Sequence, residues 1–215
     1  MVEHKNIIDN LASELKEDEN NIALFVTGSV ARGEANKTSD LDLLLVTKNA
    51  SDFVEKTEKG IVVEIKSNTL DGFITKMNDN PMNIYQWLDA KVVFEKEDLL
   101  SKLQANAQKI LNSYTPPDFP RKWLDSTMIK IVSAKEKGDD MALGFQTSNI
   151  LWKIVEGFYI LNREPLPPST TAFRRISTLK KLPDNFAGIW GSVLTGNLSE
   201  RSNATLVLLN FLLNK

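Results

Sequence analysis

The stretch that decides the fold is residues 28–43, which read GSVARGEANKTSDLDL. It follows an apolar run, IALFVT at 22–27, that is typical of a buried strand, and it ends in DLDLLLV at 40–46, which predicts a second strand. Asp40 and Asp42 alternate along that strand, so both carboxylates face the same side. Neighbouring carboxylates repel each other unless a cation neutralises them, so the pair predicts a divalent metal site, most simply Mg²⁺.

The first strand ends at Gly28, where the backbone can approach a ligand closely, and Ser29 adds a hydroxyl at the start of a short helix. Backbone N–H groups at such a turn form a site for anions. A phosphate-binding turn and a carboxylate pair lie close together in sequence. Together they predict Mg²⁺-dependent chemistry on a nucleoside triphosphate.

Gly-Ser followed on a later strand by Asp-x-Asp resembles the signature of the nucleotidyltransferase superfamily that contains DNA polymerase β and the antibiotic-modifying nucleotidyltransferases. The forms Gly-Ser-x-Ala-Arg-Gly and Ser-Asp-Leu-Asp look most like those of the small bacterial members. The C-terminal part resembles the helical bundle of kanamycin- or lincosamide-type enzymes only in size and helicity. The resemblance implies transfer of a nucleoside monophosphate from an NTP, ATP by preference, to a hydroxyl group with loss of pyrophosphate.

The resemblance also implies a role for each motif residue. Two Mg²⁺ ions would bridge the carboxylates and the triphosphate. The family's third carboxylate lies on a neighbouring strand, which matches Glu64 within IVVEI at 61–65. The implied metal-binding and catalytic residues are Asp40, Asp42 and Glu64. The implied nucleotide-binding residues are Gly28 and Ser29, with Arg32 and Ser39 as auxiliary phosphate contacts.

The composition agrees with carboxylate chemistry. The chain has 215 residues, no cysteine and one histidine, His4, which we expect near a frayed terminus. These counts exclude disulfides, thiolate zinc sites and cysteine nucleophiles, and they argue against a histidine-based metal site or a catalytic triad. No segment is typical of a signal peptide or a membrane span, so we expect a cytoplasmic protein, monomeric or homodimeric.

Hydrophobic patterning predicts an α+β chain. A mixed sheet with helices, residues 1–114, forms the catalytic domain; 115–120 (TPPDFP) is a linker; and an all-α bundle, residues 121–215, binds the substrate or a partner. In the first part we expect strands at 22–27, 40–46, 61–65 and 91–95, and helices at 3–15, 52–59, 70–77, 82–88 and 98–114. In the second part we expect helices at 121–137, 140–161, 172–182, 185–194 and 199–214.

Two features of the predicted helix 140–161 have both a structural and a functional interpretation. Gln146, Asn149, Lys153 and Glu156 form a polar stripe, which is usually a solvated face. The alternative is that Glu156 is a general base toward an acceptor hydroxyl, as a carboxylate of the helical domain is in kanamycin-type enzymes. Aromatic residues of this region are expected in the core rather than on a platform for an acceptor. They are Trp123, Trp152, Phe158 and Tyr159.

Charge is divided unevenly. Residues 1–115 carry 13 basic and 19 acidic residues, net −6, whereas residues 116–215 carry 13 basic and 9 acidic residues, net +4. The total of −2 gives no strong nucleic-acid signal, and a basic bundle does not favour a polycationic aminoglycoside. The acceptor therefore stays open between a small molecule, possible antibiotics among them, and a protein or RNA. A non-catalytic nucleotide-binding module is the alternative outside the enzyme class.

Overall fold

The computed structural model describes residues 2–49 and 52–215 and divides into two units, Met1–Ser113 and Tyr114–Lys215. The first unit contains a five-stranded mixed sheet in the order β3-β4-β2-β1-β5. Its strands are β1 (Asn21–Val26), β2 (Leu41–Thr47), β3 (Asp52–Glu58), β4 (Ile61–Asn68) and β5 (Lys91–Glu95). β2 and β4 are parallel, and the other neighbouring strands are antiparallel. The expected α+β class is confirmed.

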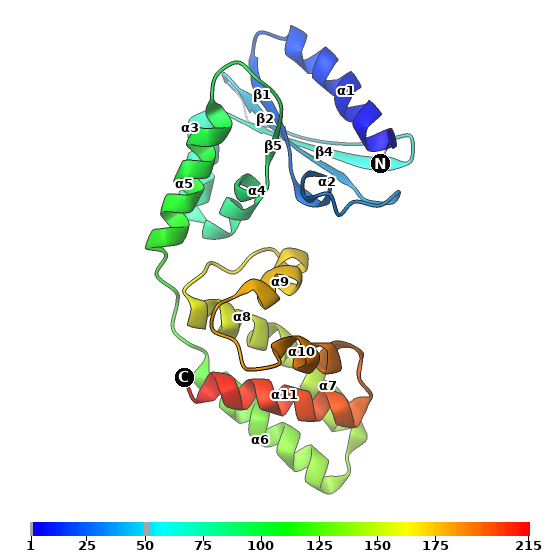
Figure 1. Ribbon diagram of the computed structural model, residues 1–215, viewed down its shortest axis with the longest axis vertical. Coiled ribbons are helices and arrows are strands. Elements are labelled where there is room, and N and C mark those ends of the chain that lie inside the picture. Colours follow the sequence, from blue (N-terminus) through cyan, green and yellow to red (C-terminus); the bar gives the residue numbers. More distant parts are fainter. Residues whose placement is uncertain (1, 50–51) are drawn as a thin grey trace. The chain divides into compact units, whose positions relative to one another are not determined.

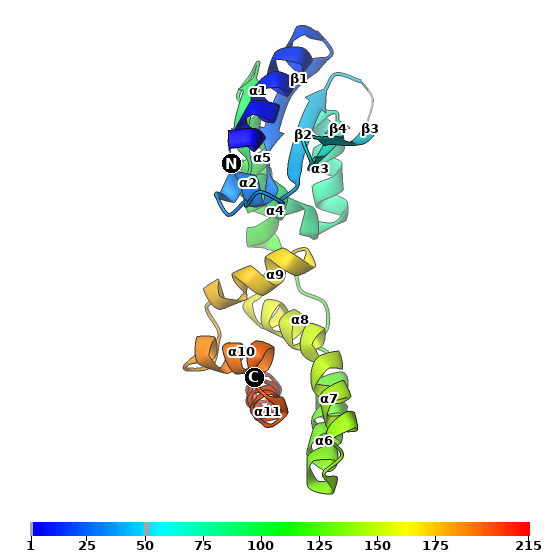
Figure 2. The same cartoon turned by 90° about the vertical axis from the view of Figure 1, so that its right-hand side faces the viewer.

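Helices cover both faces of this sheet (Figures 1 and 2). α1 (Val2–Glu17) packs Ile7 and Leu11 against one face, where Leu24 and Leu43 are buried. The other face is covered by α3 (Leu70–Asp79), the 3₁₀ turn η1 (Pro81–Asn83), α4 (Ile84–Leu88) and α5 (Leu99–Ser113). Burial on both faces explains the nearly continuous apolar run of β2. It also leaves Asp42 as the one charged residue within that strand.

The expected helix at 52–59 is wrong, because Asp52–Glu58 is strand β3, which pairs antiparallel with β4. Lys59 and Gly60 both have positive φ, 50° and 79°, as a two-residue type I′ hairpin turn requires. β3 is an edge strand with mostly exposed residues, so it lacks the apolar alternation that reveals a half-buried strand. The Lys59-Gly60 turn is the feature of the sequence that indicates a hairpin here.

The second unit is all helical. It comprises α6 (Arg121–Lys137), α7 (Asp140–Asn149), α8 (Leu151–Asn162), α9 (Ser169–Arg175), the 3₁₀ turn η2 (Ile176–Thr178), α10 (Phe186–Thr195) and α11 (Leu198–Leu213). Buried residues such as Ile131, Phe158, Trp190 and Leu208 form one core. At the edge of this core, the ring of Phe173 lies 5.7 Å from that of Trp190 and 5.9 Å from that of the more exposed Trp152.

Three expectations for this unit need correction. The helix expected at 140–161 is interrupted at Ile150, whose backbone N–H bonds to the carbonyl of Gln146 while α8 begins at the next residue. The helix expected at 172–182 is α9 followed by η2 and then an extended Leu179. Of the four aromatic residues expected in the core, Phe158 and Tyr159 are buried, whereas Trp123 is 54% exposed and Trp152 is 36% exposed.

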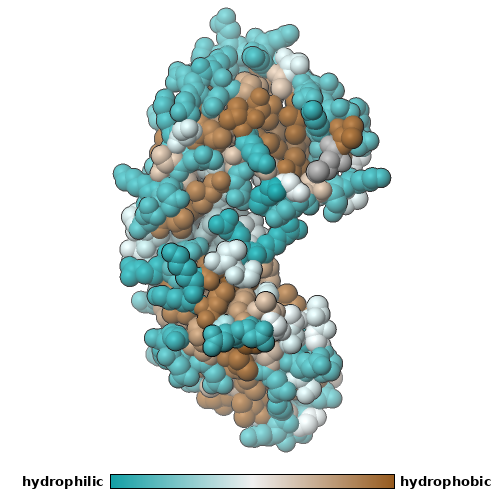
Figure 3. All heavy atoms as spheres, viewed as in Figure 1, coloured by the Kyte–Doolittle hydropathy of each residue, from teal (hydrophilic) through white to brown (hydrophobic). Residues whose placement is uncertain are grey.

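Hydrophilic residues cover most of the surface visible in Figure 3, and apolar residues reach it in patches. Among residues 2–49 and 52–215, no helix combines the length and the apolar composition that a membrane crossing requires.

Candidate active site

The turn between β1 and α2 (Gly28–Arg32) brings the backbone against Asp42. Gly28 has a φ of 65°, and a Cβ at this position would overlap Oδ2 of Asp42. The Thr27 backbone N–H donates to the Asp42 carbonyl at 2.9 Å, which fixes the turn to β2. Glycine is therefore required both by the left-handed conformation and by the neighbouring carboxylate.

Ser29 lies in the first turn of α2 and is half-buried. Its carbonyl accepts from the N–H of Glu34 at 2.9 Å, which closes the loop after the helix. In the part of the chain that the structure describes, the Ser29 hydroxyl has no hydrogen-bond partner. That hydroxyl is available to a ligand beside the Gly28 turn.

The loop before β2 is held by a residue that we expected to be frayed. His4 is only 2% exposed, and its Nε2–H donates to the carbonyl of Ser39 at 2.8 Å. Inside the loop the Asn36 N–H donates to the Ser39 hydroxyl at 2.9 Å. The expectation for His4 is wrong because an apolar helix face follows it directly and buries α1 from its first turn. His4 thus anchors the residue that precedes Asp40.

Asp40 is exposed at the end of this loop, and Asp42 is partly buried within β2. Asp42 is the register partner of Glu64 on the parallel neighbour β4. Burial raises the pKa of Asp42 above 3.8, the nearby Lys66 ammonium opposes this, and Glu64 and Asp40 add to the rise. The three carboxylates are therefore within electrostatic reach of each other.

Glu64 makes an ion pair with Lys66, whose Nζ lies 2.9 Å from Oε2 of the glutamate. Glu55 on β3 is the register partner of Glu64, which extends the row of acidic positions across three strands. Nevertheless, no three His, Asp or Glu side chains within residues 2–49 and 52–215 are grouped closely enough to hold a metal ion. Asp42 and Glu64 are brought side by side, and Asp40 is not gathered with them into a closed cluster.

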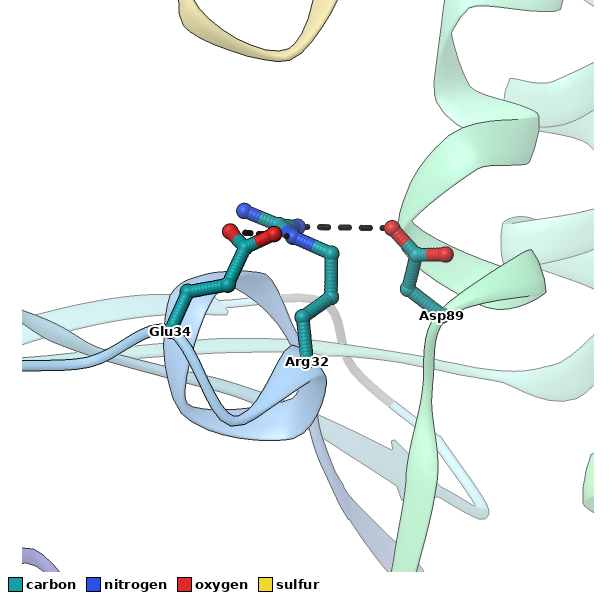
Figure 4. A network of polar contacts seen from close by, with 3 residues as sticks. All are labelled: Arg32, Glu34 and Asp89. Atoms are coloured by element: carbon teal, nitrogen blue, oxygen red, sulfur yellow. Dashed lines mark hydrogen bonds and ion pairs between the residues drawn. The ribbon is translucent and has the colours of Figure 1, made fainter. Parts of the chain in front are cut away.

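Arg32, at the end of α2, is bound by two carboxylates (Figure 4). Its Nε lies 3.0 Å from Oε2 of Glu34, and one terminal nitrogen lies 3.3 Å from Oδ2 of Asp89. Asp89 follows α4 and is 57 residues away in sequence, so no local motif indicated it. These contacts hold the guanidinium next to α2.

Glu156 belongs to the second unit, on α8. Its carboxylate makes an ion pair with Lys153 at 2.5 Å, one turn earlier on the same helix. Burial, and secondly the charge of Glu156, raises the pKa of Tyr114. Of the polar stripe, Lys153 and Glu156 thus form an intrahelical ion pair on α8, whereas Gln146 and Asn149 lie on α7.

The oxygen-only donor set of Asp40, Asp42 and Glu64 is the kind that Mg²⁺ prefers, and a partly buried carboxylate with carboxylate neighbours is stabilised by a cation. The family described as "Nucleotidyltransferase domain" matches residues 8–126. The chain belongs to this family.

The match covers nearly all of the sheet unit and extends into α6. As a nucleotidyltransferase, the protein is an enzyme that transfers a nucleoside monophosphate from an NTP, and its family generally uses divalent metal ions. A nucleotidyltransferase-like protein from Exiguobacterium sibiricum 255-15 has a similar structure, with a TM-score of 0.40 and 14% identity over 96% of this chain and 73% of that one. No curated protein matches the chain.

Proposed function

We propose that this nucleotidyltransferase uses Mg²⁺ and ATP to transfer adenosine monophosphate to a hydroxyl group of a small molecule in the cytoplasm. The observation that carries the proposal is the Asp42 carboxylate, which lies against the Gly28 turn and in register with Glu64. In this arrangement the proposed phosphate-binding turn at Gly28 lies next to the proposed metal ligands Asp42 and Glu64. Bound Mg²⁺ would neutralise the triphosphate and stabilise the leaving pyrophosphate.

In this proposal each residue has one task. Asp40, Asp42 and Glu64 would hold the metal ions, and Glu64 would exchange its ion pair with Lys66 for the metal. The Ser29 hydroxyl and the backbone at Gly28 bind the triphosphate. This assignment gives the Ser29 hydroxyl the partner that it lacks within the described chain.

Arg32 and Ser39 support the same ligand. Arg32 has a planar guanidinium that suits bidentate phosphate contact, and Glu34 and Asp89 hold it beside α2. Ser39 acts through its backbone position, since its hydroxyl accepts from Asn36 and its carbonyl from His4. We propose Glu156 as the base toward the acceptor, with Lys153 stabilising its ionised form.

The acceptor is a neutral or anionic small molecule in this proposal, because the second unit carries an excess of basic residues. Polycationic aminoglycosides do not meet that description. A protein or an RNA end is the alternative acceptor, and it is tested by the same reaction with a different substrate.

The test measures pyrophosphate release from ATP with and without Mg²⁺, with each acceptor followed by mass spectrometry. We expect release only with Mg²⁺, and an adenylylated product with an acceptor of the right class. Asp42→Asn should lose the activity, whereas Asp125→Asn, an exposed aspartate of α6, should keep it. Saturable ATP binding without release in the presence of any acceptor class would contradict the proposal.

A further inference from the structure

A groove between α6 and α7 lies wholly within the second unit and shares no residue with the motif site. Its cavity is about 380 Å³, and α6 contributes Lys122, Trp123, Ser126 and Lys130 to its lining. α7 contributes Phe145 and Gln146. This volume is within the range of sites for small ligands, which are about 300–1,000 Å³.

Two aromatic side chains on this groove are exposed. Trp123 is 54% exposed and Phe145 is 64% exposed, although each is large enough to contribute substantially to a core. The core of the same unit is filled by other rings, such as Phe158, which is fully buried. Exposed rings on a concave surface favour a ligand with a flat apolar part that stacks on them.

The charged groups on the groove are all positive. Lys122, Ser126 and Lys130 are spaced four residues apart, so they lie along one face of α6. No acidic residue lines the groove. Within the described ranges neither lysine forms an ion pair, in contrast to Lys153, which Glu156 neutralises. The groove is therefore complementary to an anion.

We propose that this groove binds a small aromatic phosphate monoester. The ring stacks on Trp123 and Phe145, the phosphate lies between the ammonium groups of Lys122 and Lys130, and the Gln146 amide bonds polar atoms at the ring edge. A nucleoside monophosphate and a simple aryl phosphate share this chemistry. The site is independent of nucleotidyl transfer, so it is tested by binding alone.

The experiment is isothermal titration of the full chain in EDTA with AMP and with phenyl phosphate. Three compounds serve as controls. Phenol has the ring without the phosphate, inorganic phosphate has the anion without the ring, and benzylamine has a ring with a positive charge. We expect saturable binding of both phosphate esters, with affinity at least about tenfold above that for phenol, phosphate or benzylamine. If AMP binds more tightly than phenyl phosphate, the natural ligand is a nucleotide. If the two bind equally, an aromatic ring and a phosphate are sufficient for recognition.

Variants separate this groove from the motif site. Lys130→Glu should weaken binding of phenyl phosphate by about tenfold, whereas Lys137→Glu, an exposed lysine of the same helix outside the groove lining, should change it by less than about twofold. Trp123→Ala should weaken binding and Trp123→Phe should retain it. Circular dichroism verifies that each variant folds. If Trp123→Ala does not fold, the two lysine variants alone test the proposal. Equal affinity of the two lysine variants, or phenol binding as tightly as phenyl phosphate, overturns the proposal.

Discussion

Asp42 occupies with its Oδ2 the space that a side chain on Gly28 would need. The approach joins the turn after β1 to the start of β2, and the hydrogen bond from the Thr27 N–H to the Asp42 carbonyl reinforces it. The glycine turn and the Asp42 carboxylate are therefore held next to each other. In the proposed site, a phosphate at the turn and a metal ion at the carboxylate would therefore be neighbours.

Gly28→Ala tests this contact. The variant must shift the turn or the carboxylate and must also hold a positive φ, so we expect a loss of about 1–3 kcal/mol in the free energy of unfolding and a large loss of pyrophosphate release. Gly33→Ala is the matched control, because Gly33 has a φ of 75° with open space around its Cβ position. It should lose stability through φ alone and keep most activity. Equal losses of activity in the two variants would show that the contact with Asp42 is unimportant.

Asp42→Asn should separate stability from activity. Because the pKa of Asp42 is raised in the fold above 3.8, chiefly by burial, its ionised form is less favourable there than in the unfolded chain. The free energy of unfolding that depends on this group therefore falls as pH rises through the raised pKa, and it is unaffected below 3.8, where both states are protonated. We expect the metal-free variant to be more stable than the native protein at about pH 7 and to lose that advantage in acid.

Urea unfolding in EDTA, at about pH 7 and at a pH below 3.8, measures the difference in stability between Asp42→Asn and the native protein. Asp40→Asn is the control, because Asp40 is exposed and its substitution should change stability by less than about 0.5 kcal/mol at either pH. Both variants should lose at least about a hundredfold in rate if both carboxylates hold metal. An Asp42→Asn variant that is less stable than the native protein at both pH values would refute the electrostatic interpretation.

His4→Ala tests whether the hydrogen bond from His4 to the Ser39 carbonyl holds the loop before β2 in place. The change removes the donor to the Ser39 carbonyl in a buried setting, so we expect a loss of about 1–3 kcal/mol in the free energy of unfolding. Because Asp40 is displaced rather than removed, the rate should fall and then recover as Mg²⁺ is raised. In Asp40→Asn it should stay low at every Mg²⁺ concentration. Lys5→Ala, at the exposed neighbouring position, should leave both quantities unchanged, and a rate of His4→Ala that ignores Mg²⁺ would argue against the anchor.

Much of the site was predictable because its residues are local in sequence. The Gly28 turn follows from the glycine after an apolar strand, and the pairing of Asp40 with Asp42 follows from strand periodicity. Glu64 follows from the family resemblance, which implies a third carboxylate on a neighbouring strand, and ligation itself stays a prediction. The partners that tertiary packing supplies were not predictable. Asp89 reaches Arg32 from the position after α4, and His4 gains its role only when α1 packs on the sheet.

The misassigned β3 shows a second limit. An edge strand needs no apolar face, so Glu55 gave no periodic signal and its place in the acidic row across β2, β4 and β3 stayed hidden. The interruption at Ile150 was equally hidden, because the apolar pattern continues through it. Lys59 and Gly60 mark the turn after β3 locally, whereas no local pattern marks the interruption at Ile150.

Lys66→Met tests whether an ammonium group competes with the metal. Lys66 is 2.9 Å from Glu64 and lowers the pKa of Asp42, so in the metal-free protein it supplies positive charge to two of the carboxylates. Its removal should lower the Mg²⁺ concentration for half-maximal rate by about threefold to tenfold, because the ion no longer displaces a competitor. Lys56→Met is the control, since Lys56 has an equivalent pair with Glu58 at 3.6 Å on the edge strand. An unchanged Mg²⁺ requirement in Lys66→Met, or an equal change in both variants, would show that the Glu64 ion pair plays no part in metal binding.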